Sequence, residues 1–197
     1  MNDRFIIVGQ FRKGDVRALI ENSALRVFSS RGYDSASIAE IARDAGVSTG
    51  NVYVYFANKQ ALYRAVMDPS IGKELGKLLQ RELSSFRKAP SEELVDFVVR
   101  NRLQVSIVLG GVTGNESEST LETVVHDLVR VTLRRTRRPM RTNAGSHLRF
   151  ALEQLHSSFL RSLGTTLRTF RSRDDIRSVV AVCFIHHSAG LRELLDD

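Results

Sequence analysis

One short stretch, VSTGNVYVYFANKQAL at residues 47–62, concentrates hydroxyl, amide and ammonium groups. Helical spacing turns Val52 and Phe56 inward, toward a core. The residues left on the outer side are Thr49, Gly50, Asn51, Tyr53 and Tyr55. Lys59 follows at the start of the next helix, where a positive charge faces the positive end of the helix dipole. A negative group outside the protein, such as a phosphate, would convert this unfavourable arrangement into a binding site.

Cap residues predict the helices that position these groups. Ser37 and Glu40 have the spacing of a capping box, and Gly46 ends the helix that they begin. Ser48 caps the next helix after a very short turn, and Asn58 caps a third. Two short helices joined by so tight a turn form a helix-turn-helix.

Helical periodicity continues to the end of the chain, and strand-like alternation is nearly absent. Further helices are expected over about 15–31, 69–86, 91–109, 120–137, 143–170 and 174–195, with an interruption at Asp68-Pro69. The sequence therefore predicts an all-α fold in two parts, residues 1–67 and residues 68–197.

Composition limits the class of protein and its partners. The 197 residues carry a formal net charge of +7, which favours nucleic acid first and an anionic membrane surface second, with plain solubility as the simpler explanation. The single cysteine, Cys183, indicates a small buried side chain and a reducing cytoplasm. No apolar run approaches the length of a membrane span. We expect no metal and no cofactor, and no motif of an enzyme is recognisable.

Residues from Arg17 to Val66 resemble the DNA-binding domain of the TetR family of transcriptional repressors. The resemblance is carried by AGVS-x-G-x-x-Y and by the overlapping Y-x-[HY]-F-x-[SN]-K-x-x-L, which this chain spells between Ala45 and Leu62. It covers roughly the first third of the chain. It implies a three-helix helix-turn-helix DNA-binding domain followed by a helical ligand-binding and dimerisation domain.

The resemblance also implies roles for the outer residues of the second short helix. Thr49, Gly50 and Asn51 would lie at the end that meets the base edges of double-stranded DNA, and an Asn amide can pair with adenine. Tyr53 and Lys59 would bind phosphates, and their chemistry agrees. Val54, where many relatives carry a polar or basic residue, offers only an apolar contact. The remaining predicted DNA-binding residues are Ser37, Ser48 and Tyr55.

The C-terminal part is expected to hold a small-molecule effector and to form a homodimer through its last two helices. Candidate ligand residues are Phe97, Asn101, Gln104, His147 and Gln154, each of which could equally make ordinary contacts between helices. Candidate dimer residues are Phe159, Leu163, Val180, Cys183, His187 and Leu191. For His187, a core position is favoured over a pH-sensitive role at the interface.

Two basic segments carry hypotheses of their own. Arg12 and Lys13, in an N-terminal arm, could lie along a phosphate backbone, or the arm could be a frayed terminus. The cluster RRTRRPMR could be a solvated helix end or an anion site; its arginines are Arg134, Arg135, Arg137, Arg138 and Arg141.

Two functions remain open at this point. The first is a cytoplasmic, TetR-like repressor that binds a palindromic operator as a dimer and is released by a small molecule. The alternative is a DNA-binding protein without a small-molecule input, controlled by a protein partner or acting as an architectural factor.

Overall fold

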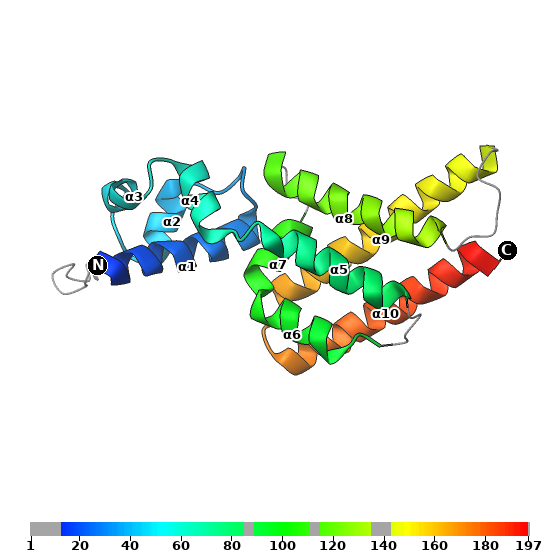
Figure 1. The fold of residues 1–197 in the computed structure, drawn as a ribbon. Helices are drawn as coiled ribbons and strands as arrows, with labels where there is room; N and C mark the ends of the chain where they lie inside the picture. The colour runs from blue at the N-terminus through cyan, green and yellow to red at the C-terminus, as the bar shows by residue number, and fades with distance from the viewer. Residues whose placement is uncertain (1–12, 85–88, 111–114, 135–142, 197) are drawn as a thin grey trace. The chain divides into compact units, whose positions relative to one another are not determined.

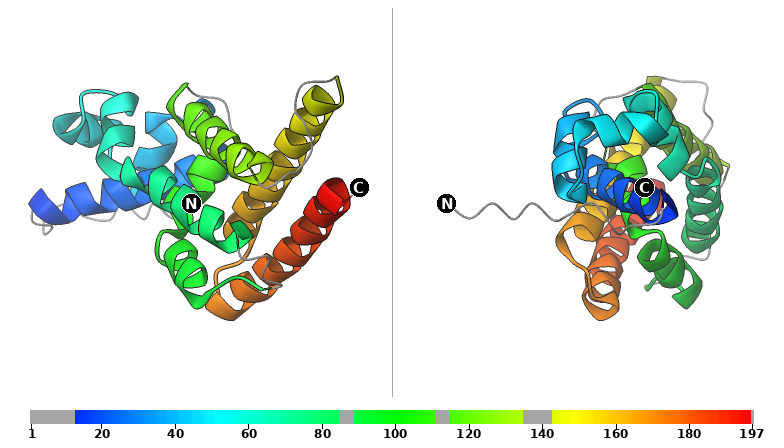
Figure 2. Two further views of the ribbon diagram at one scale, coloured as in Figure 1. Left: turned by 45° about the vertical axis from the view of Figure 1, so that its right-hand side comes forward. Right: turned by 90° about the vertical axis from the view of Figure 1, so that its left-hand side faces the viewer.

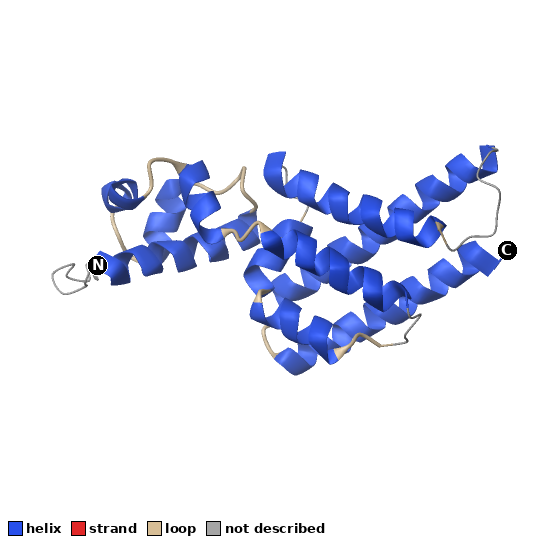
Figure 3. Ribbon diagram, viewed as in Figure 1, coloured by secondary structure: helices blue, strands red, loops and turns tan. Residues whose placement is uncertain are grey.

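The computed structural model describes residues 13–84, 89–110, 115–134 and 143–196. Within these ranges every regular element is a helix, so the predicted all-α fold is confirmed (Figure 3). The chain divides into two compact units, Met1–Asp68 and Pro69–Asp197. Arg12 and most of the arginine cluster, Arg135 to Arg141, fall outside the described residues.

Among its described residues, the first unit contains four helices, α1 Lys13–Arg31, α2 Ile38–Ala45, α3 Thr49–Tyr55 and α4 Lys59–Val66 (Figure 1). Helix α1 packs against α2 and α4, and α2 packs against α3. Apolar side chains from all four helices are completely buried where they meet: Ile20, Ala24, Ile41, Val52 and Leu62. Burial of these side chains is the main source of stability, because helices this short are marginal in isolation.

Caps explain where the short helices begin and end. Ser37 and Glu40 form the predicted capping box at the start of α2, and Gly46 ends that helix with a φ of 70°. Only glycine adopts this left-handed conformation without steric cost, which allows the tight turn into α3. Ser48 accepts a hydrogen bond from the backbone N–H of Asn51 at 3.2 Å and so caps α3.

The second unit contains six helices within the described residues: α5 Ser70–Ser84, α6 Glu92–Arg100, α7 Arg102–Leu109, α8 Asn115–Leu133, α9 Asn143–Thr169 and α10 Arg173–Asp196. Helix α9 lies at the centre and packs against α7, α8 and α10, while α5 packs against α8 (Figures 1 and 2). The completely buried apolar residues of α9 are Leu152, Leu160, Leu163 and Leu167.

Glycines allow two of these helix pairs to approach closely. A Cβ atom at Gly164 of α9 would lie 2.9 Å from the Cβ of Leu109 in α7. A Cβ at Gly72 of α5 would overlap the methyl group of Thr120 in α8. Both glycines are therefore required by packing between helices, because a larger residue would force the helices apart.

Two predicted helices differ from those observed. The single helix expected over 91–109 is broken at Asn101, whose backbone lies outside the helical region at φ −103° and ψ 25°. The Asn101 side chain donates to Phe97 O at 3.0 Å, and such local bonding competes with a continuous helix. Helix α8 begins at Asn115, five residues before the expected start. The interruption predicted at Asp68-Pro69 is present between α4 and α5.

Candidate nucleic-acid interface

Helix α3 has one buried face and one exposed face. Val52 is completely buried and Phe56, which follows the helix, is 4% exposed. On the other side, Tyr53 is 53% exposed and Val54 is 68% exposed. The turn at Gly46 joins α2 to α3, so the described residues contain a helix-turn-helix whose second helix presents a free surface.

The predicted DNA-binding residues occupy two kinds of position. Thr49 and Gly50 are exposed at the N-terminal end of α3, with Asn51 half-buried beside them. Tyr55 is half-buried at the other end of the helix. The hydroxyls of Ser37 and Ser48 instead cap α2 and α3, so their oxygen atoms already accept backbone hydrogen bonds. The outer surface of α3 is therefore formed by the first group, and the two serines set its orientation.

Lys59 has three acceptors within its own chain. Its Nζ atom donates to the backbone oxygens of Tyr33 at 2.7 Å, Ala36 at 3.0 Å and Asp34 at 3.2 Å. The same ammonium group lies 4.5 Å from the centre of the Tyr33 ring. These carbonyl oxygens carry partial negative charge, and they lie beside Lys59 where the sequence pattern predicts a phosphate. The phosphate role of Lys59 stays a prediction, since an ammonium has only three hydrogens to donate.

A second polar contact holds α1 to the helix-turn-helix. Asp44 of α2 accepts hydrogen bonds from Arg26, with Nη2 at 2.6 Å, and lies 2.7 Å from the hydroxyl of Ser23. Burial opposes ionisation of Asp44, but the bonds from Ser23 and Arg26 outweigh it and lower the pKa of this carboxyl group. Sequence reasoning missed this contact because its members lie on different helices at no characteristic spacing.

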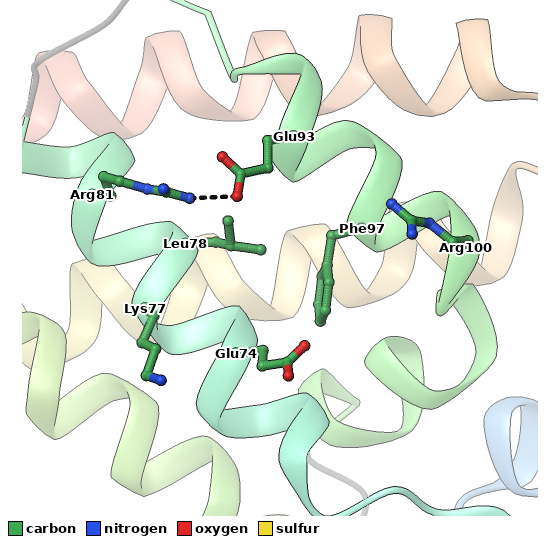
Figure 4. Close-up of a pocket in the computed structure, with 7 residues that line it drawn as sticks. All are labelled: Glu74, Lys77, Leu78, Arg81, Glu93, Phe97 and Arg100. Carbon is green, nitrogen blue, oxygen red and sulfur yellow. Dashed lines mark ion pairs between the residues drawn. The ribbon is translucent and has the colours of Figure 1, made fainter.

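The five candidate ligand residues differ in exposure and in the helices that carry them. Asn101 forms the junction between α6 and α7, Gln104 is half-buried in α7, and His147 and Gln154 are exposed on α9. Phe97 alone among them lines the groove drawn in Figure 4.

That groove lies between α5 and α6 and has a volume of about 450 Å³. Phe97 and Leu78 face each other across it, and the ion pair between Arg81 and Glu93, at 2.8 Å, spans one end (Figure 4). The other residues that line it are charged: Glu74, Lys77 and Arg100. The groove thus combines a small apolar floor with a charged rim, and its volume lies in the range of small-molecule sites.

The candidate dimer residues are mostly core residues of the single chain. Cys183 is half-buried, and the others are at least 95% buried: Phe159, Leu163, Val180, His187 and Leu191. These five therefore contribute little to the free surface of α9 and α10. Among the described side chains of these helices, the exposed large apolar residues are Phe150, at 64%, Val182, at 65%, and Ile185, at 53%.

His187 belongs to a buried cluster between α8, α9 and α10. Its ring stacks on Phe159, with centres 4.4 Å apart, and lies 5.0 Å from the ring of His156. His156 shares a hydrogen bond with Thr132 at 3.2 Å, while its Nδ1 and both nitrogens of His187 have no partner among the described residues. Burial lowers the pKa of His156 to about 4 and that of His187 to about 3, so both rings are neutral near pH 7.

Two further classes of site are absent from the described residues. They contain no group of three or more His, Cys, Asp or Glu side chains that could hold a metal ion. None of their helices is long and apolar enough to cross a membrane.

Comparison with known proteins adds to this geometry. Residues 20–66 match the sequence model of a family described as bacterial regulatory proteins, tetR family. The chain is 36% identical over 61 residues to YuxN, an uncharacterized HTH-type transcriptional regulator of Bacillus subtilis, a match that covers 31% of this chain and 21% of that protein. It is 30% identical over 112 residues to the HTH-type transcriptional regulator AcrR of Shigella flexneri, a match that covers 57% of this chain and 49% of AcrR.

These matches span between about a fifth and a half of the length of the relatives. Among solved structures, a tetR-family transcriptional regulator from Streptomyces coelicolor aligns with 93% of this chain and 90% of its own, at 24% identity and a TM-score of 0.40.

Proposed function

The chain belongs to the TetR family of bacterial regulatory proteins, and from this premise we propose that it represses transcription by binding a palindromic operator as a homodimer. The observation that carries the proposal is the exposed face of α3, the second helix of the helix-turn-helix. A helix in this position enters the major groove, where side chains reach base edges. The net charge of +7 supports binding to a polyanion.

In this proposal α3 provides the contacts that select a sequence. Thr49, Gly50 and Asn51 approach the base edges with the N-terminal end of the helix, and the hydroxyls of Tyr53 and Tyr55 bind phosphates. Lys59 acts mainly through its bonds to the loop before α2, which set the position of the helix-turn-helix.

The homodimer is proposed to form through the exposed side of α10. Val182, Ile185 and Ala189 are all exposed and follow one another at the spacing of one helix face. An apolar face of this kind favours contact with a second copy of the chain. A twofold dimer would provide two α3 helices, one for each half-site of a palindrome. This surface replaces the buried residues that the sequence analysis named.

A small-molecule effector is proposed to bind the groove between α5 and α6. Its apolar part would lie on Phe97 and Leu78, with polar groups meeting the charged rim. Release from DNA then requires that the effector binds one conformation of the dimer more tightly than the other. We place the protein in the cytoplasm, where bacterial DNA lies, and assign it no reaction.

The other four ligand candidates do not line this groove, which favours a second possibility, a DNA-binding regulator controlled by a protein partner. A thermal-shift screen of small molecules separates the two. Compounds that stabilise the wild type but not a Phe97→Ala variant support the effector site, while a screen without any such compound favours the protein partner.

The proposed function itself is tested by selecting bound fragments of the source genome at near-physiological salt. A variant with Asn51→Ala and Tyr53→Phe serves as the control, because neither change removes a buried side chain. Recovery of a palindrome that the variant loses, with raised transcription of the neighbouring gene when the protein is deleted, supports repression. Equal and sequence-independent recovery by both proteins, lost steeply with salt, would contradict it.

A further inference from the structure

The centre of the exposed face of α3 carries no hydrogen-bonding side chain. Each helical residue advances by about 100°, so Gly50 and Val54 lie opposite the buried Val52. Asn51 and Tyr53 lie on either side of this line. The most outward positions of the proposed recognition helix are therefore a glycine and an apolar residue.

Val54 is the most exposed large apolar residue in the described part of the chain, at 68%. Its two methyl groups can neither donate nor accept a hydrogen bond. In the major groove the base edges offer donors, acceptors and one apolar group, the 5-methyl of thymine. Of these features, only the thymine methyl gains from contact with Val54.

Gly50 stands one turn before Val54, and the fold does not require it to be glycine. A Cβ atom built at Gly50 would meet a single neighbour, the Ser48 Oγ, at 3.9 Å, and the backbone is not left-handed there. This contrasts with Gly72, where a Cβ would collide with Thr120. The space left by the missing side chain at Gly50 is open to the outside, which lets the helix approach another molecule closely.

We propose that Val54 selects thymine at one position of each half-site by contact with its 5-methyl group, and that Gly50 provides the clearance for this contact. The inference rests on the proposed function, because it requires α3 to enter the major groove. It adds a specific base preference that hydrogen bonding by Asn51 or Tyr53 does not supply.

The test uses the full-length protein and an operator selected from random DNA duplexes. Each thymine of the operator is replaced in turn by uracil, which lacks the methyl group and keeps the same pairing and hydrogen-bonding groups. Binding of the wild type should fall about three- to tenfold at one symmetric pair of positions, the scale expected for one buried methyl group. In a Val54→Ala variant the same replacement should change binding less than twofold.

Two controls separate this contact from general effects. Tyr53→Phe should weaken binding to thymine and uracil operators by the same factor, because a phosphate contact carries no base preference. Thermal melting checks that Val54→Ala folds, as expected for an exposed helical position where alanine is favourable.

The outcomes distinguish the inference from the function beneath it. If no uracil replacement weakens operator binding by the wild type, Val54 does not contact a thymine methyl group and the inference is wrong. The inference is also wrong if a uracil replacement weakens binding by the wild type and by Val54→Ala to the same extent. If the wild type selects no sequence at all, the proposed function is wrong and the inference falls with it.

Discussion

The Nζ atom of Lys59 lies 2.7 Å from the backbone oxygen of Tyr33, and its charge lies 4.5 Å from the centre of the Tyr33 ring. This contact joins the start of α4 to the loop that follows α1. A lysine at a helix N-terminus is unfavourable for the helix dipole, and three carbonyl oxygens compensate for it. The side chain thus links the start of α4 to the loop between α1 and α2.

Replacing Lys59 by methionine should therefore destabilise the first unit. The change leaves the half-buried carbonyls without their donor and should lower the free energy of unfolding by about 1–3 kcal/mol. Urea-induced unfolding followed by circular dichroism measures the effect. Lys77→Met in α5 is the matched control. Because Lys77 is exposed, its replacement should leave the free energy of unfolding unchanged. Equal stability of Lys59→Met and wild type, with a loss of DNA affinity alone, would restore Lys59 as primarily a phosphate ligand.

Alanine at Gly50 should separate stability from binding. The substitution favours the helix and should raise stability by about 0.4–1 kcal/mol, because its Cβ meets only the Ser48 Oγ at 3.9 Å. Operator affinity should fall, since the new methyl group faces the DNA. Gly72→Ala, the same change in α5, should instead destabilise the protein by its collision with Thr120. A Gly50→Ala variant with unchanged operator affinity would argue against close approach of α3.

How far the sequence predicted these features depends on how local their causes are. The capping box at Ser37, the turn at Gly46 and the buried Val52 arise from contacts within a few residues, and all three were predicted. The acceptors of Lys59 lie 23 to 26 residues away along the chain, at irregular loop positions, and no spacing rule indicates them.

In the C-terminal unit, too, the sequence predicted only part of the structure, but for a different reason. Periodicity identified the apolar sides of α9 and α10, but Leu163 and Val180 are buried within the chain while Val182 and Ile185 are exposed. A helix between several neighbours carries apolar residues on more than one side, so its pattern alone does not separate core from interface. The break at Asn101 was missed because one polar residue scarcely disturbs the period.

A charged residue on the exposed side of α10 should disrupt the proposed dimer. Ile185→Glu would place a carboxylate in an apolar contact and should weaken dimerisation by about tenfold or more. Sedimentation analysis across a concentration series measures this change, and affinity for the palindrome should fall with it. Val54→Glu, on an exposed apolar residue of the first unit, should leave the oligomeric state unchanged. If Ile185→Glu remains as dimeric as the wild type, the interface lies elsewhere.

The buried histidine pair should make stability sensitive to acid. Burial lowers the pKa of His156 to about 4 and, together with the charges of His156 and His186, that of His187 to about 3, from an ordinary 6.5. The unfolded chain therefore binds protons first as pH falls below about 6.5, and stability decreases from there down to about pH 3. At about pH 5 each ring should lower the free energy of unfolding by about 2 kcal/mol relative to its value at neutral pH.

A His187→Phe variant should lose roughly half of this pH dependence, since a phenyl ring can stack on Phe159 without titrating. Urea unfolding at pH 7 and pH 5 provides the comparison, and the exposed His147→Gln serves as control. An unchanged difference between the two pH values in His187→Phe would assign the acid sensitivity to other groups.

Selection from random duplexes would show whether the outer face of α3 selects the DNA sequence. The wild type and a Thr49→Ala, Asn51→Ala variant would be compared at the same salt concentration. We expect a palindrome of identical half-site spacing for both proteins, with base preference lost in the variant at one or two symmetric pairs of positions. Identical preferences at every position, or no preferred sequence for the wild type, would contradict this expectation.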